Sequence, residues 1–298
     1  MIVLFHQVFR LVLKGIHGKL RLSDLVLEDI PRIYSKNQWK KIIKEQSVFV
    51  NGTMGTTGTW VQSEDILEID FNTFSPANAY EMKLEVIYED EDIIVVNKPS
   101  GIIVSGNKFR TLENALLHHL KDQLTAEFRP RFIHRLDGQT SGLIVGAKNY
   151  ESMLKLQLLM SKRRIEKKYL SIVAGEVPVQ STISLPIKGK SAMTSFQRLR
   201  IIESKKYGPM SLLLIKLNEG RTHQIRIHMN SMGHPVIGDK LYNYGVTKNI
   251  KGLFLHAVHL RFSHPKTNEP LVIHSPIPKR FEKFGVSRDD LLQILSSE

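Results

Sequence analysis

The chain has 298 residues, 42% hydrophobic and 24% charged, which is the composition of an ordinary globular protein and not of a disordered chain. The absence of cysteine excludes disulfide scaffolds, thiolate nucleophiles and cysteine-ligated zinc or iron–sulfur sites. The 42 Lys and Arg residues outnumber the 29 Asp and Glu residues by 42 − 29 = 13, and this excess favours a polyanionic partner.

The N-terminal run Met1–Phe5 is apolar, but His6, Gln7 and Arg10 interrupt the apolar pattern directly after it. The run has neither a basic start nor a small-residue cleavage site, so we expect no signal peptide. No stretch reaches the roughly 18 consecutive apolar residues of a transmembrane helix. We therefore expect a cytoplasmic protein with no membrane partner.

A polar, turn-like run at Asn72–Asn78 indicates a linker within residues 72–83. It divides the chain into a predicted small domain at 1–75 and a larger one at 84–298.

In the small domain, Ser35 is expected to cap a helix over Lys36–Gln46. Its apolar face has helical spacing and consists of Trp39, Ile42 and Ile43. Three lysines four residues apart form an opposing stripe: Lys36, Lys40 and Lys44. A strand at Val48–Val50 then ends in the turn dipeptide Asn51-Gly52. A solvated lysine face and an RNA-binding face both fit this pattern.

The segment from Arg21-Leu22 to Asn51-Gly52 resembles an S4 RNA-binding domain. The matching pieces are Arg21-Leu22, Pro31, the helix with Lys40 and Lys44-Glu45, and the strand before Asn51-Gly52. Three positions depart from the family pattern, namely Ser23, Asn37 and Gln46, the last of which replaces a glycine that ends the helix. The resemblance implies that the lysine stripe contacts RNA.

The larger domain is rich in short β-type runs and has few helices. The expected strands are Ile93–Val96, Leu143–Val145, Leu170–Val173, Leu212–Leu217 and Leu271–His274. The expected helices are Leu112–Lys121, Tyr150–Arg164 and His223–Met232. Grouped strands with few helices predict an α+β fold with a mixed or antiparallel sheet.

The most specific motif is Phe132–Val145, in which an apolar strand enters a polar loop and a second apolar strand leaves it. His134, Arg135 and Asp137 share this loop, and Gly138 and Gly142 allow it to turn tightly. Loops held by rigid strands are common places for catalytic groups. From these residues alone, a catalytic loop and a turn in which Asp137 accepts backbone hydrogen bonds are both open.

Further motifs follow in order, and together they resemble the RluA family of pseudouridine synthases over roughly residues 84–278. The matching segments are Asp92–Gly101, His134–Gly142, Lys167–Leu170, Gly220–Met229, Gly233–Asp239 and Leu255–Leu260. Gly138 and Gln139 depart from the family, which often has a basic and then an acidic residue there.

The resemblance implies an α+β pseudouridine synthase catalytic domain, preceded by the small α+β S4-like domain. It implies conversion of uridine in RNA to pseudouridine, with no cofactor and no metal. The matched catalytic residues are Asp137 as the essential carboxylate, Arg221 as the arginine paired with it, and Tyr169 as the ring that packs on uracil.

Other matched residues are expected at the RNA: Arg135 near the flipped nucleotide, with His134, Thr140 and Lys167 beside it. We expect RNA and not DNA as the partner, large-subunit ribosomal RNA ahead of tRNA, and a monomer.

Two alternatives remain open. Gly138 and Gln139 leave room for a catalytically silent RNA-binding or ribosome-assembly factor of the same fold. A carboxylate-based glycoside hydrolase would need a second acid paired with Asp137, and the loop motif His134–Gly142 holds none.

Overall fold

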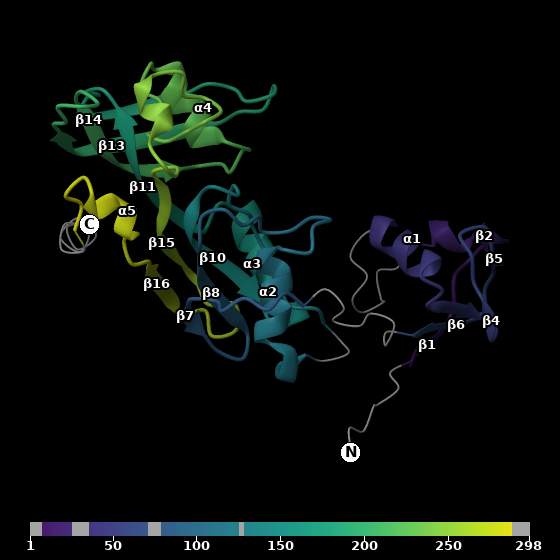
Figure 1. The fold of residues 1–298 in the computed structure, drawn as a ribbon. Helices are drawn as coiled ribbons and strands as arrows, with labels where there is room; N and C mark the ends of the chain where they lie inside the picture. The colour runs from purple at the N-terminus through teal and green to yellow at the C-terminus, as the bar shows by residue number, and fades with distance from the viewer. Residues whose placement is uncertain (1–7, 26–35, 71–78, 125–127, 288–298) are drawn as a thin grey trace. The chain divides into compact units, whose positions relative to one another are not determined.

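The computed structural model describes residues 8–25, 36–70, 79–124 and 128–287 (Figure 1). The chain divides into two compact units. The N-terminal unit comprises Met1–Ala79 and Leu120–Arg129, and the C-terminal unit comprises Tyr80–His119 and Pro130–Glu298. The linker predicted at 72–83 lies largely outside the described ranges, so the predicted domain boundary stays a prediction. No helix in the described ranges is long and apolar enough to cross a bilayer.

The N-terminal unit contains a four-stranded sheet of order β1-β6-β3-β4. Its strands are β1 (Val8–Val12), β3 (Val48–Val50), β4 (Thr53–Met54) and β6 (Ile66–Asp70). A two-stranded sheet pairs β2 (Leu20–Arg21) with β5 (Trp60–Val61), and the 3-10 turn η1 (Leu22–Asp24) follows β2. Asn51 and Gly52 both have positive φ and join β3 to β4 in a two-residue hairpin, which confirms the predicted turn.

Helix α1 (Lys36–Lys44) lies against η1 and has one buried face. The predicted cap, Ser35, lies outside the described residues. The predicted apolar face is confirmed, because the helical residues Trp39, Ile42 and Ile43 are at most 2% exposed. The Trp39 indole N–H donates to the Leu22 carbonyl over 2.6 Å, which ties the helix to η1.

The end of α1 takes the left-handed backbone conformation that glycine adopts most easily. Gln46 has φ of 60°, its N–H donates to the Ile43 carbonyl, and the Ser47 N–H donates to the Ile42 carbonyl. This pair of bonds is the Schellman pattern, in which the left-handed residue is usually glycine. The helix therefore ends at Lys44, two residues before the predicted Gln46, and Gln46 strains the turn that follows it.

The C-terminal unit is built on a ten-stranded sheet, with the path β12-β13-β14-β11-β15-β10-β8-β7 and with β16 on β15 and β9 on β10. The strands are β7 (Val86–Glu89), β8 (Ile93–Lys98), β9 (Arg131–Phe132), β10 (Ser141–Ala147), β11 (Glu166–Ala174), β12 (Gln180–Ser184), β13 (Met193–Ile202), β14 (Met210–Leu217), β15 (Leu255–Ser263) and β16 (Pro270–His274). Every strand pairing described in this sheet is antiparallel except that of β10 with β15, so the predicted mixed sheet and all five predicted strands of this unit are confirmed.

The helices of this unit are α2 (Leu112–His119), α3 (Tyr150–Ser161), α4 (Gln224–Ser231) and the short α5 (Lys279–Glu282). The first three confirm the predicted helices, although each ends earlier than expected. Two 3-10 turns are η3 (Lys121–Gln123), which belongs to the N-terminal unit, and η4 (Val246–Asn249). Figure 1 shows α2 and α3 beside β8 and β10, and α4 beside β13.

The parallel pair β10–β15 requires glycine at one position. Gly142 has φ of 115°, and a Cβ atom there would lie 2.2 Å from the Ala257 carbonyl oxygen. The backbone of β10 can approach β15 this closely only without a side chain. The polar loop that precedes β10 is therefore anchored at the centre of the sheet.

The strain at the end of α1 predicts a stabilising substitution. Replacing Gln46→Gly should raise the free energy of unfolding of the N-terminal unit by about 1 kcal/mol, since glycine has no Cβ to clash in the left-handed region. Tryptophan fluorescence during urea unfolding reports on this unit, because both tryptophans of the chain, Trp39 and Trp60, lie in it. Gln46→Ala keeps the Cβ and should bring no gain. A gain of equal size in both variants would show that strain is not the cause.

Candidate active site

The predicted polar loop runs from β9 to β10, and a second loop clamps it. The Gly138 carbonyl accepts the N–H of Gly101 at 2.7 Å and the Lys98 ammonium at 3.1 Å. The Ser100 hydroxyl donates to the Gln139 carbonyl at 2.7 Å. These three donors come from the end of β8 and the turn after it. The loop that carries Asp137 therefore has a fixed backbone.

Lys98 is the central donor of this clamp and is fully buried. Its ammonium also donates to the Pro99 and Ile102 carbonyls at 3.0 and 2.7 Å. Three carbonyl acceptors match the three N–H bonds of a charged ammonium group. Burial lowers the pKa of Lys98 to about 7, although the nearby charge of Asp137 acts in the opposite direction.

The Asp137 carboxylate lies close to a buried arginine on α4. Its Oδ2 is 3.4 Å from Nη1 of Arg226 and 3.7 Å from Nε2 of His223. The Arg226 guanidinium is itself held by Asp239, with Nε donating to Oδ2 at 2.7 Å and Nη2 donating to Oδ1 at 2.8 Å. One guanidinium thus bridges two carboxylates.

The charges of this bridge support one another. Burial disfavours the charge of Arg226, but the hydrogen bonds and charges of Asp239 and Asp137 outweigh it and raise the pKa of the guanidinium. Burial would raise the pKa of Asp239, but Arg226 and the N–H groups of Leu241 and Tyr242 outweigh it and lower that pKa. Asp239 therefore stays ionised, binds the fork formed by Nε and Nη2 of Arg226, and leaves Nη1 facing Asp137.

The expected partner of Asp137 was Arg221, and this pairing is corrected. The Nε of Arg221 donates to the Ser191 carbonyl at 3.1 Å, and the arginine that contacts Asp137 is Arg226. The physical reason is position. Arg221 precedes α4 in a turn, whereas Arg226 lies on the buried face of the helix beside Ile225 and Met229.

A cavity of about 60 Å³ brings several predicted residues together. Its lining includes Asp137, Arg135, Thr140, Tyr169 and Arg221. Tyr169 is 7% exposed, and burial, helped by the charge of Asp137, raises the pKa of its phenol, so the hydroxyl stays protonated. Arg135 is exposed, and its side chain is open to an incoming ligand. The cavity thus combines a carboxylate, a neutral aromatic ring and two arginines.

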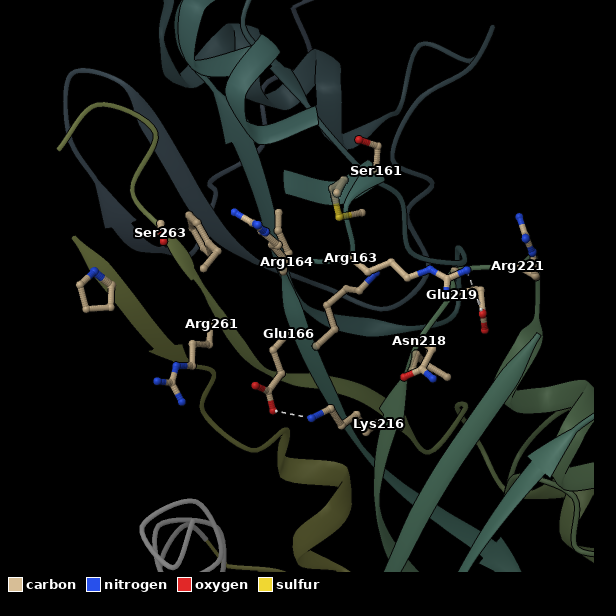
Figure 2. A pocket seen from close by; sticks show the side chains of 17 residues that line it. Ser161, Arg163, Arg164, Glu166, Lys216, Asn218, Glu219, Arg221, Arg261 and Ser263 are labelled. Atoms are coloured by element: carbon tan, nitrogen blue, oxygen red, sulfur yellow. Dashed lines mark ion pairs between the residues drawn. The ribbon is translucent and has the colours of Figure 1, made fainter. Parts of the chain in front are cut away.

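Two predicted RNA-binding residues do not line this cavity. The ring of His134 accepts the Val145 N–H at 3.3 Å through Nε2, and burial lowers the pKa of His134 to about 3, so it is neutral and holds the loop against β10. One ring nitrogen of His134 is thus engaged by the backbone, and its expected RNA contact stays a prediction. Lys167 lines a larger groove that adjoins the cavity (Figure 2).

The predicted lysine stripe belongs to the N-terminal unit. Lys36, Lys40 and Lys44 are all exposed on α1. The ammonium of Lys36 lies 3.0 Å from a carboxylate oxygen of Asp24, and this contact, first by hydrogen bonding and then by charge, lowers the pKa of that carboxyl. The stripe is therefore solvent-facing and partly neutralised at its first turn.

Four residues of the site were not predicted: Arg226, Asp239, Lys98 and His223. Helical spacing carried a usable signal for Arg226, since it stands one residue after Ile225 and three before Met229. His223 gave no signal, because its proximity to Asp137 depends on a left-handed backbone with φ of 58° before α4.

A buried chain of hydrogen bonds fixes the start of β10. Arg280 on α5 donates to the Ser141 hydroxyl at 2.6 Å, and this hydroxyl lies 2.9 Å from Nδ1 of His256. Nε2 of His256 lies 3.0 Å from the Ser275 hydroxyl, which donates to the Pro276 carbonyl. Since the Ser275 hydroxyl donates its proton to Pro276, it accepts from Nε2–H of His256. Burial keeps the ring neutral, so Nδ1 carries no proton and accepts from the Ser141 hydroxyl, which itself accepts from Arg280.

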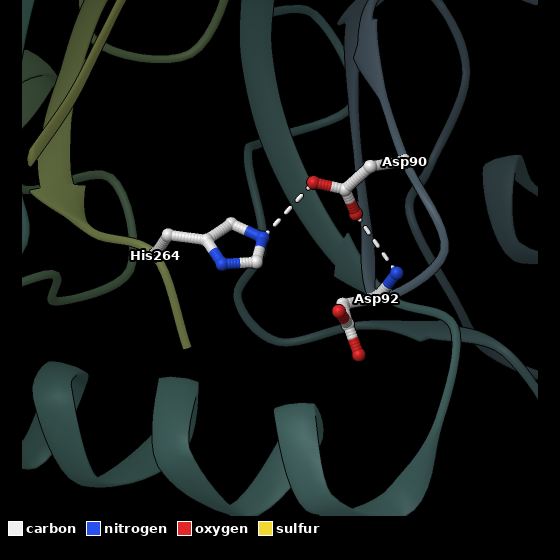
Figure 3. A group of neighbouring side chains, drawn as sticks. All are labelled: Asp90, Asp92 and His264. Atoms are coloured by element: carbon white, nitrogen blue, oxygen red, sulfur yellow. Dashed lines mark hydrogen bonds and ion pairs between the residues drawn. The ribbon is translucent and has the colours of Figure 1, made fainter. Parts of the chain in front are cut away.

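One group of metal-ligand type lies away from the cavity, formed by Asp90, Asp92 and His264 (Figure 3). Nδ1 of His264 accepts two backbone N–H groups, so Nε2 carries the proton and donates to Asp90 at 2.9 Å. Asp90 also accepts from Tyr88 and from the N–H groups of Asp92 and Ile93. Protein donors occupy these lone pairs, so the group joins two turns rather than offering a cation site.

Comparisons with known proteins identify the family to which the chain is similar. The family described as RNA pseudouridylate synthase matches residues 92–231. The ribosomal large subunit pseudouridine synthase D of Vibrio parahaemolyticus is 32% identical, covering 86% of this chain and 87% of the relative. That of Pasteurella multocida is 33% identical, covering 88% and 89%. The structure of human RNA pseudouridylate synthase domain containing 1 matches with a TM-score of 0.59 at 27% identity, covering 72% of this chain and 96% of that chain.

The neutral ring of His256 predicts a loss of stability in mild acid. Burial and the charge of Arg280 lower the pKa of His256 to about 3, whereas the unfolded chain has an ordinary value near 6.5. The unfolded state therefore gains the proton first, and stability that is present above pH 6.5 is lost as the pH falls. Between pH 7.5 and pH 5.5 the contribution of His256 to the free energy of unfolding should fall by about 1.4 kcal/mol.

Urea unfolding followed by circular dichroism measures this loss. His256→Gln keeps polar contacts but does not titrate, so its stability should fall by about 1.4 kcal/mol less than that of the wild type. Equal losses in the two proteins would show that His256 takes up its proton normally when folded.

Proposed function

Since the chain belongs to the RNA pseudouridylate synthase family, and is therefore an RNA-modifying isomerase, we propose that Asp137 carries the reaction and that large-subunit ribosomal RNA is the substrate. The observation that carries the first part is the Asp137 carboxylate, held 3.4 Å from the buried Arg226 in a cavity that Tyr169 also lines.

The chemistry of isomerisation suits this set of residues. The bond between N1 of uracil and C1′ of ribose breaks, and a bond between C5 and C1′ forms; C5 loses a proton, and N1 gains one. A carboxylate can attack C1′ or stabilise positive charge there. A neutral tyrosine ring can hold the detached base by stacking, which is worth about 1–3 kcal/mol.

Arg135 supports the entry of the nucleotide. A uridine in a folded RNA must leave its stack, at a cost of a few kcal/mol. Arg135 is exposed, lines the cavity and lies two residues before Asp137 in the same loop, so its guanidinium can occupy the gap that the base leaves. Thr140 is 2% exposed, and its N–H donates to the Asp137 carbonyl, which supports a positioning role.

The relatives support the choice of RNA. Several of them are named ribosomal large subunit pseudouridine synthase D, and the chain covers 87–92% of their lengths. We assign residues 84–298 as the catalytic domain and 1–75 as an S4-like RNA-binding domain whose lysine stripe contacts phosphates. An enzyme for ribosomal RNA would work in the cytoplasm.

Replacing Asp137→Asn tests the proposed catalytic residue. Release of tritium from RNA labelled at uridine C5 should fall at least about 100-fold, since the charge at the reacting carbon is lost. RNA affinity should change little, because the loop backbone is held by Lys98 and Gly101. Asp122→Asn removes an exposed carboxylate and should keep full activity. Normal release by the Asp137 variant would contradict the assignment, and tight RNA binding without release by the wild type would favour a silent assembly factor.

The corrected arginine pairing predicts a contrast between two variants. Arg226→Gln should lower kcat by about 100-fold or more with little change in KM, because the Asp137 carboxylate loses its fixed partner. Arg221→Gln should mainly raise KM. Arg226→Lys, which keeps the charge but not the fork, checks for misfolding, since its circular dichroism should match the wild type. A loss of kcat confined to Arg221→Gln would restore the pairing expected from the sequence.

A further inference from the structure

A groove of about 720 Å³ lies between the end of α3, the start of β11 and the turn after β14. Figure 2 shows arginine and lysine side chains around it. Its six basic lining residues are Arg163, Arg164, Lys167, Lys216, Arg221 and Arg261, against the two acidic residues Glu166 and Glu219. The groove therefore carries a formal excess of four positive charges, by 6 − 2.

Both carboxylates of the groove are already engaged. Glu219 accepts the Met193 N–H at 2.7 Å and pairs with Arg163 at 3.3 Å. Glu166 lies 3.4 Å from the ammonium of Lys216 and 3.5 Å from that of Lys168. Within the described part of the chain, these pairs leave the lining no free acidic group that could neutralise its other cations.

Four cations of the groove have no carboxylate partner among the residues that the structure describes: Arg164, Lys167, Arg261 and Arg221, whose Nε donates to the Ser191 carbonyl. Arg164 and Arg261 are exposed, whereas Lys167 is half-buried, and burial lowers the pKa of its ammonium. A half-buried cation without an anion is an unfavourable arrangement in the free protein. An anionic ligand in the groove would relieve it.

The groove is continuous with the catalytic cavity. Leu217, Gly220 and Arg221 line both. Gly220 leaves the junction without a side chain, and a Cβ there would lie 3.9 Å from Nζ of Lys167. A chain that enters the cavity can therefore extend into the groove past Lys167.

We propose that this groove binds the phosphodiester backbone of the RNA strand that flanks the target uridine, with Arg164, Lys167 and Arg261 as its phosphate contacts. The proposal rests on the proposed function, because it extends the strand whose uridine enters the cavity. Guanidinium groups bind phosphate oxygens through two parallel hydrogen bonds, which suits the arginines. An acidic peptide could match the charge, but it would have no reason to continue into a nucleotide cavity.

The full-length double variant Arg164→Ala/Arg261→Ala tests the proposal by its affinity for a fluorescein-labelled single-stranded 12-mer of uridylate. Each lost phosphate contact should reduce the magnitude of the slope of log K against log salt by about 0.7, so the slope of the double variant should be smaller by about 1.4. If the variant and the wild type bind equally at 1 M salt, the variant should bind about 25-fold more weakly at 0.1 M salt. Lys205→Ala/Lys206→Ala removes two exposed charges outside the groove and should leave the slope unchanged.

Tritium release and competition complete the test. The groove variant should show a raised KM for ribosomal RNA and an unchanged kcat, since the groove holds the strand and not the reacting base. An unchanged salt slope, or equal losses in the groove and control variants, would overturn the proposal. Polyglutamate that displaces the 12-mer from the control but not from the groove variant would assign the groove to an acidic protein segment. If neither the wild type nor any variant released tritium, the proposed function would be contradicted. The comparison of salt slopes would still show whether the groove binds the RNA backbone.

Discussion

The guanidinium of Arg226, shared between Asp239 and Asp137, is the contact on which the site depends. A buried arginine is tolerable only where carboxylates compensate for its lost hydration. Asp239 does so with two short hydrogen bonds and is held in turn by the N–H groups of Leu241 and Tyr242. Because these bonds already fix the side chain of Arg226, its remaining N–H group can face Asp137 with no further loss of side-chain entropy. Helix α4 and the turn after Asp239 thus fix the charge that faces the loop carrying Asp137.

The loop that carries Asp137 lies beside the Arg226 charge because contacts with the sheet hold the loop in place. Gly142 allows β10 to lie against β15, the Arg280–Ser141–His256 chain fixes the first residue of β10, and Lys98 binds the carbonyl next to Asp137. None of these contacts involves the Asp137 carboxylate. The Asp137 carboxylate can therefore stay accessible while these contacts set the position of its loop.

Sequence patterns predicted the main helices and strands well, because the spacing of apolar residues close together in the chain determines them. Apolar runs bounded by turns gave β8, β10, β11, β14 and β16, and helical spacing gave the buried face of α1. The pairing of Asp137 was wrong because it depends on which side of α4 faces the loop. Arg221 and Arg226 stand five residues apart in one motif, and only the packing of α4 decides which of them reaches Asp137. The bond between the His134 ring and the Val145 N–H left no signal in the sequence either, since it depends on how β9 pairs with β10.

A crystal structure of the Asp137→Asn protein with an RNA that the wild type modifies would test the proposed site most directly. We predict a single uridine turned out of its strand, with its ring on Tyr169, its C1′ beside residue 137, and Arg226 still bound to Asp239. A uridine bound elsewhere, or RNA held without any base in the cavity, would contradict the proposed site.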